Sequence, residues 1–112
     1  STVWGTGHGP LSGGGGRGGQ TILAEPASAA FHTYRIDWTA DQITWYVDDI
    51  PYYTYTKSDS DWVFDHEFYV ILNLAMGGNF TGNIDPKLNT ANIQVDYVRM
   101  YSIDGVGEVI NH

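Results

Sequence analysis

Cysteine is absent from the 112 residues of this chain. Disulfides, thiolate metal sites and cysteine nucleophiles are therefore excluded, and cysteine usage leaves the cellular compartment open. Basic residues are scarce, with 5 Lys and Arg against 13 Asp and Glu, a formal net charge of -8. Nucleic acids and anionic membranes reward basic patches, so this balance argues against both as partners. Neutral ligands, sugars among them, are compatible with it.

Long apolar runs are also missing, and none approaches the length of about 18 residues that predicts a membrane span. No stretch repeats apolar residues with the helical period. Aromatic residues are plentiful instead, with 8 Tyr, 4 Trp and 4 Phe, and aromatics favour strands. The chain begins at Ser1 without Met or the charged and apolar regions of a signal peptide, which predicts a processed chain or part of a longer one.

Alternating and apolar stretches predict an all-β fold, typical of a sandwich. The glycine-heavy residues from Ser1 to Gly19 predict a loop, apart from a strand end near Val3 to Thr6. Asp48-Asp49 predicts a hairpin turn, and the clustered acids of residues 61–67 predict a solvated loop. The remaining strands are expected at residues 31–38, 43–47, 50–56, 68–75 and 93–101.

The run from Val70 to Asn83 begins as an apolar strand and ends in a glycine-rich loop that carries amides. A near-continuous apolar strand is expected to have both faces covered. Asn73 lies inside the apolar part, where a buried and unpaired amide would cost about 1–3 kcal/mol. The position of Asn73 therefore predicts that its amide is used.

Several segments follow one another in a recognisable order, namely Gly5-Thr6-Gly7-His8-Gly9-Pro10 and residues 31–38, 43–48, 61–83 and 95–101. Together they resemble laminarinase-like enzymes of glycoside hydrolase family 16, and the resemblance covers residues 4 to 101. It implies a β-jelly-roll sandwich of two curved antiparallel sheets, of which this chain forms about half. The expected division is a domain part over residues 1–104 and a tail or linker over residues 105–112.

The resemblance also implies retaining hydrolysis of β-1,3-glucan or mixed-linkage glucan, which needs two carboxyl groups about 5–5.5 Å apart. In the family they lie in a Glu-x-Asp-x-x-Glu motif, which none of the 13 acids here forms. We therefore expect the C-terminal half of a catalytic domain, inactive by itself. Its partner would be the N-terminal half, possibly as a second chain.

The same resemblance assigns substrate-binding roles to residues that would line the sugar cleft. His8 would hydrogen-bond a sugar hydroxyl or hold a catalytic carboxyl, and Asn73 would point its amide into the cleft. Asn79 and Phe80 would lie at the rim, with Phe80 where relatives usually carry Trp. Trp4 is a further stacking platform or a core residue. His32 lies on an alternating strand, and we expect it to have a structural role.

Asp96 matches the family's calcium-ligand position, and a carboxylate oxygen suits Ca2+, which takes six to eight oxygens. The other ligands would come from the missing half. Asn79-Phe80-Thr81 is also a glycosylation sequon, and a glycan there would block the cleft rim. We therefore expect a bacterial source, in which the sequon would be silent. The resemblance further implies a secreted protein with a structural calcium.

Two other interpretations remain open. One is a non-catalytic β-glucan recognition protein, because relatives that have lost the carboxylates exist. The other is an isolated or engineered half-domain. The missing strand discriminates among them, since a Glu-x-Asp-x-x-Glu strand on the partner would favour the enzyme.

Overall fold

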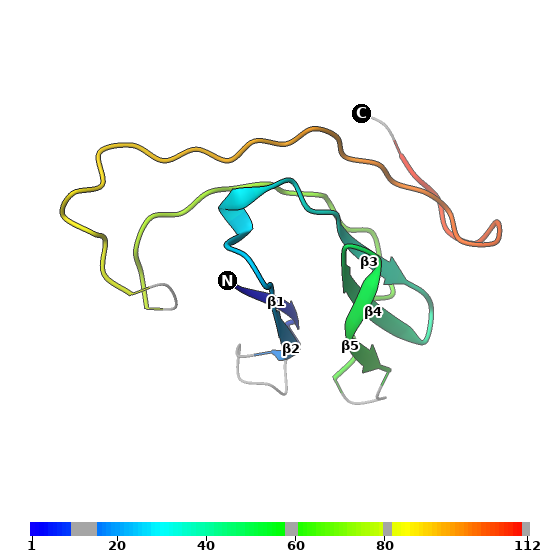
Figure 1. The fold of residues 1–112 in the computed structure, drawn as a ribbon. Helices are drawn as coiled ribbons and strands as arrows, with labels where there is room; N and C mark the ends of the chain where they lie inside the picture. The colour runs from blue at the N-terminus through cyan, green and yellow to red at the C-terminus, as the bar shows by residue number, and fades with distance from the viewer. Residues whose placement is uncertain (10–15, 58–60, 80–81, 111–112) are drawn as a thin grey trace. The chain divides into compact units, whose positions relative to one another are not determined.

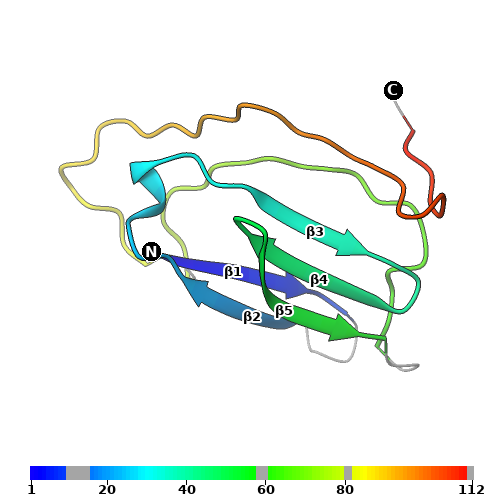
Figure 2. The same cartoon turned by 45° about the vertical axis from the view of Figure 1, so that its right-hand side comes forward.

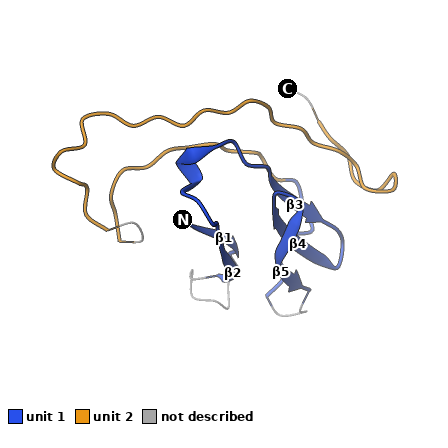
Figure 3. Cartoon of the chain, viewed as in Figure 1, with its two compact units in different colours: residues 1–67 blue, residues 68–112 orange. Residues whose placement is uncertain are grey.

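The computed structural model describes residues 1–9, 16–57, 61–79 and 82–110. The chain divides into two compact units, Ser1–Glu67 and Phe68–His112, shown in two colours in Figure 3. All strands of the described residues pair in antiparallel fashion, which confirms the all-β class. Their helical structure is limited to the short 3-10 turn Ala27–Ala29. No helix in this part of the chain is long and apolar enough to cross a membrane.

The first layer of the N-terminal unit is a two-stranded ribbon of β1 (Thr2–Gly7) and β2 (Arg17–Ile22). Thr2 pairs with Ile22 at one end and Gly7 with Arg17 at the other. The strand near Val3 to Thr6 is thus confirmed. The predicted loop is wrong for residues 17–19, because β2 begins at Arg17, and residues 10–15 of that loop lie outside the described residues. A Cβ on Gly19 would lie 2.8 Å from the Tyr53 side chain, so glycine here serves close packing and not a loop.

The second layer is a three-stranded sheet in the order β3-β4-β5, seen opposite the ribbon in Figures 1 and 2. Its strands are β3 (Tyr34–Trp38), β4 (Gln42–Val47) and β5 (Ile50–Thr56). Asp48 and Asp49 connect β4 to β5 with φ values of 51° and 65°. Positive φ at both central residues is required in a type I′ hairpin turn, and Asp tolerates it. The predicted hairpin is therefore confirmed.

An aromatic core fills the space between the two layers, with Trp45, Tyr55 and Trp62 among its buried members. The face of β1 that meets it carries glycine. A Cβ on Gly5 would come 2.6 Å from the Trp45 ring, and one on Gly7 would come 3.2 Å from Tyr55. The bare backbone of the ribbon therefore lies directly against the aromatic face of the sheet.

The C-terminal unit lacks the two strands predicted for residues 68–75 and 93–101. Within its described residues, pairing is limited to two isolated bridges, Gly78 with Gly82 and Ile103 with Val106. Tyr69 and Ile71 are 85% and 77% exposed, so the apolar run that was expected to be covered on both faces is open. The pattern was strand-like, but a strand also needs a neighbour to accept its backbone hydrogen bonds. The division at residue 104 falls inside the bridged turn of residues 103–106 and stays a prediction.

Candidate functional site

The outward face of β1 holds two of the predicted sugar-contact residues. Successive side chains of a strand point to opposite faces, and the glycines at positions 5 and 7 face the core. Trp4 and Thr6 consequently face outward, and His8 continues the same alternation just past the strand. Trp4 is 52% exposed, and His8 is exposed as well. Trp4 is thus not a core residue of this unit.

The facing strand adds a residue that the sequence reasoning missed. Gln20 pairs directly with Trp4 and is exposed, and Gly18 pairs with Thr6. The alternation of Gln20 with Thr21 and Ile22 was the signal for it, but the surrounding glycines hid the strand. The face formed by Trp4, Thr6, Gly18 and Gln20 is called the ribbon face below.

The other predicted contacts belong to the C-terminal unit. Asn73 lies in its unpaired apolar run and is exposed, so the expected burial of its amide is not observed. Asn79 is exposed beside Gly78, which has a φ of 126° and bridges to Gly82. Phe80 lies outside the described residues. The roles of all three in sugar binding stay predictions.

The predicted solvated acid cluster is wrong for one of its members. Asp61 is only 1% exposed, whereas Asp65 and Glu67 are exposed as predicted. Asp61 accepts hydrogen bonds from Arg17 Nε at 3.2 Å and from the Tyr55 hydroxyl at 3.3 Å. These donors compensate the burial of the carboxylate, which the local sequence did not reveal because Arg17 is distant in the chain.

Asp61 also joins the two sides of the glycine-rich segment. A Cβ on Gly9 would lie 2.6 Å from Asp61 Oδ1, and Arg17 lies at the start of β2. The hydrogen bond to Asp61 raises the pKa of Arg17 above its ordinary value, so the guanidinium stays charged. The carboxylate is thus hydrogen-bonded to the start of β2 and lies close to Gly9, just past the end of β1.

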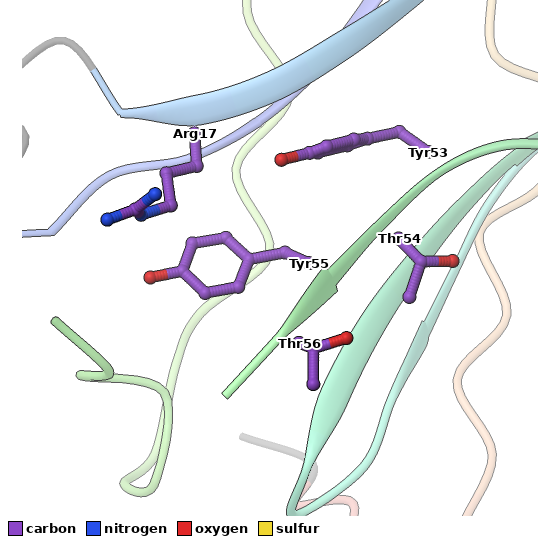
Figure 4. A pocket seen from close by; sticks show the side chains of 5 residues that line it. All are labelled: Arg17, Tyr53, Thr54, Tyr55 and Thr56. Carbon is purple, nitrogen blue, oxygen red and sulfur yellow. The ribbon is translucent and has the colours of Figure 1, made fainter. Parts of the chain in front are cut away.

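A cavity of about 320 Å³ opens beside this pair, between β2 and β5 (Figure 4). Arg17 enters it from β2, while the rings of Tyr53 and Tyr55 enter from β5. Hydroxyl groups and one guanidinium that is already paired line this space. It contains no carboxyl pair of the kind that glycoside hydrolysis requires. A second cavity, of about 330 Å³, lies between the layers beside Trp45, Tyr46 and Tyr52.

His32 lies beside the turn of the β4–β5 hairpin, in agreement with its predicted structural role. Its Nδ1 is 2.6 Å from Asp48 Oδ2, and the Thr33 N–H donates to Asp48 Oδ1 at 3.0 Å. These hydrogen bonds, with His32 as the larger cause, lower the pKa of Asp48 below its ordinary value. The pair attaches the chain before β3 to the hairpin turn.

The calcium prediction rests on one carboxylate. Asp96 is exposed at a bend of the C-terminal unit. Among the residues that the structure describes, no group of three or more His, Cys, Asp or Glu side chains could hold a metal ion. These residues by themselves do not build a calcium site.

Comparison with known sequences identifies the family. Residues 1–99 match the family described as glycosyl hydrolases family 16. An all-β chain with antiparallel sheets agrees with part of that domain. The chain belongs to glycosyl hydrolase family 16. No solved structure matches it.

Relatives of two kinds appear among the similar proteins. A Rhodothermus marinus protein named "Beta-glucanase" is 41% identical over 95 residues, covering 76% of this chain and 33% of the relative. A Niallia circulans "Glucan endo-1,3-beta-glucosidase A1" is 40% identical, covering 63% and 12%. A Penaeus monodon "Beta-1,3-glucan-binding protein" is 35% identical, covering 43% and 19%. This chain therefore spans a third or less of each relative's length.

Proposed function

We propose that this chain forms one wall of the glucan cleft of a retaining endo-1,3-β-glucanase. The observation that carries the proposal is the outward placement of Trp4 on β1, with the exposed His8 just past the end of that strand, within the segment that matches the family. An exposed indole offers a flat apolar surface to a sugar ring, and an imidazole offers hydrogen bonds to its hydroxyls. Asn73, Asn79 and Phe80 would add further contacts from the cleft loop.

The catalytic carboxyl pair would lie outside these 112 residues. Glu occurs here only at positions 25, 67 and 108, and none begins a Glu-x-Asp-x-x-Glu motif. A retaining mechanism requires one carboxyl group as nucleophile and a second as acid and base. The rest of the domain, supplied in the same or another polypeptide, would contribute both.

The unpaired runs of the C-terminal unit agree with such a partner. Residues 68–76 and 93–101 alternate or are apolar, are exposed, and pair with no described strand. Added strands from the rest of the domain would satisfy their backbone groups and cover their side chains. By itself, the chain is expected to be prone to association through these segments.

Reducing-sugar release from laminarin tests the proposal. The purified 112-residue chain should release nothing above background, and adding the rest of its family 16 domain should restore hydrolysis. In the restored enzyme, Asn73→Ala should lower kcat/KM with little change in stability. Hydrolysis by the chain alone would overturn the assignment of the carboxyl pair, and an unchanged kcat/KM would remove Asn73 from the site.

A glucan-binding role without hydrolysis is the second candidate. The similarity to the Penaeus monodon glucan-binding protein favours it. The two candidates share the ribbon face but differ in the missing strand. Reading that strand in the complete protein decides between them, because only the enzyme needs Glu-x-Asp-x-x-Glu.

We also propose a structural calcium at Asp96, with its remaining oxygen ligands supplied by the rest of the domain, and secretion from a bacterium. A carboxylate on an exposed bend is chemically suited to Ca2+. In the completed domain, Ca2+ should raise the Tm and Asp96→Asn should abolish that rise. An equal rise in the Asp96→Asn variant would place the ion elsewhere.

A further inference from the structure

The ribbon face brings an amide next to an indole. Trp4 and Gln20 are directly paired across β1 and β2. Cβ atoms of such facing residues lie about 4.5–5.5 Å apart, so the two side chains emerge side by side. Both are exposed on the face that points away from the aromatic core.

The surface beside this pair is low and polar. Gly18, the next residue of β2 on the same face, has no side chain, and it pairs with Thr6. A Cβ on Gly18 would come 2.7 Å from Thr6 Oγ1, so the hydroxyl lies over the bare backbone. The Trp4 ring, the bare backbone of Gly18 and the neutral polar groups of Gln20 and Thr6 are therefore adjacent.

Close packing through glycine lies directly under this face. Gly5 and Gly19 pair on the inward side and meet the rings of Trp45 and Tyr53, at 2.6 and 2.8 Å from their would-be Cβ positions. The backbone of the ribbon is therefore in close contact with these two rings, which favours one fixed spacing between the ribbon and the sheet. A pre-formed surface loses little entropy when a ligand binds, which favours recognition by a few contacts.

We infer that Gln20 is a substrate-contact residue which, with Trp4, forms a subsite for one neutral hexose unit. The indole covers the apolar face of the sugar ring, while the amide donates to one hydroxyl and accepts from its neighbour. The Thr6 hydroxyl forms a hydrogen bond at the edge of the same sugar ring. The inference rests on the proposed function, which places a β-glucan on this side of the ribbon.

Titration of the full 112-residue chain with laminarihexaose tests the inference, monitored by NMR at the Trp4 indole and Gln20 side-chain amide. Trp4→Ala should raise the Kd about tenfold or more, and Gln20→Ala about fivefold. Gln42→Ala is the matched control, because Gln42 is an exposed glutamine at the start of β4, and its Kd should equal that of the wild type. Gln20→Thr, which suits a strand, repeats the test if the alanine variant does not fold.

The outcomes separate the inference from the proposed function. If Trp4→Ala weakens binding while Gln20→Ala and Gln20→Thr leave the Kd unchanged, the role of Gln20 is overturned and glucan binding on the ribbon face stands. If wild type shows no shift at millimolar laminarihexaose, both the subsite and the placement of glucan on this face are overturned. A Gln42→Ala effect equal to that of Gln20→Ala overturns the inference as well.

Discussion

The two units of this chain have similar strand-like patterns but different structures. In Ser1–Glu67, each strand pairs with a neighbour that follows or precedes it closely, and an aromatic core lies between the layers. In the described part of Phe68–His112, comparable apolar runs have no ladder and stay exposed. Figure 3 separates the two by colour.

The difference teaches that an alternating or apolar pattern specifies a strand only where a pairing partner is within reach. The turn at Asp48 and Asp49 brings β4 and β5 together across two residues. Between residues 68–76 and 93–101, the antiparallel bridge of Gly78 with Gly82 is not extended into a ladder by the described residues. Backbone groups without a strand partner remain solvated, and the side chains remain open to water.

Truncating a core ring should have the largest effect. Trp45→Ala removes a side chain that is 7% exposed, and should lower the free energy of unfolding by about 3–5 kcal/mol. Tyr69→Ala, in the C-terminal unit, removes a ring that is 85% exposed and should change it by less than about 0.5 kcal/mol. Chemical denaturation measures both. Equal losses of unfolding free energy in the two variants would contradict the difference between the units.

Adding one methyl group between the layers should have the next largest effect. Gly5→Ala places a Cβ 2.6 Å from the Trp45 ring and should destabilise the N-terminal unit by about 1–3 kcal/mol. Thr6→Ala, its outward neighbour, is the control and should be nearly neutral. Thermal unfolding compares them. A neutral Gly5→Ala would mean that the layers do not pack through the glycine face.

Removing the buried carboxylate should loosen the start of β2. Asp61→Ala deprives the Arg17 guanidinium and the Tyr55 hydroxyl of their acceptor, at a cost of about 1–2 kcal/mol. Asp65→Ala is the matched control, because Asp65 is exposed on the same segment. Hydrogen exchange at β2 should rise only in Asp61→Ala. Similar exchange rates in both variants would show that the hydrogen bonds to Asp61 do not stabilise the start of β2.

The smallest effect should appear as a pH dependence at the hairpin. Because the folded-state pKa of Asp48 is below its ordinary value of 3.8, its contribution to stability is present above pH 3.8 and is lost as the pH falls through the lowered pKa. Asp48→Asn should reduce the Tm slightly at neutral pH. It should also flatten the acid limb of the curve of Tm against pH, which is the fall of the Tm as the solution is acidified. Asp49→Asn keeps the turn and should leave that limb steep. Identical acid limbs would remove Asp48 from the linkage.

Much of the N-terminal unit was predictable because its information is local. The β4–β5 hairpin followed from apolar strands around two Asp residues, and Trp4 and His8 followed from a strand resemblance. Asp61 and Gln20 were not predictable in the same way. The burial of Asp61 depends on Arg17, which is 44 positions away, and Gln20 becomes a neighbour of Trp4 only through the β1–β2 register.

By itself, the sequence determined the all-β class, the hairpin turn and the membership of family 16, since turn chemistry, periodicity and motif order are properties of neighbouring residues. It also established that no Glu-x-Asp-x-x-Glu motif is present. The tertiary structure decided which acid is buried, which face of β1 is open and which apolar runs stay unpaired. Those outcomes depend on hydrogen-bond partners and packing surfaces that distant parts of the chain either supply or leave absent.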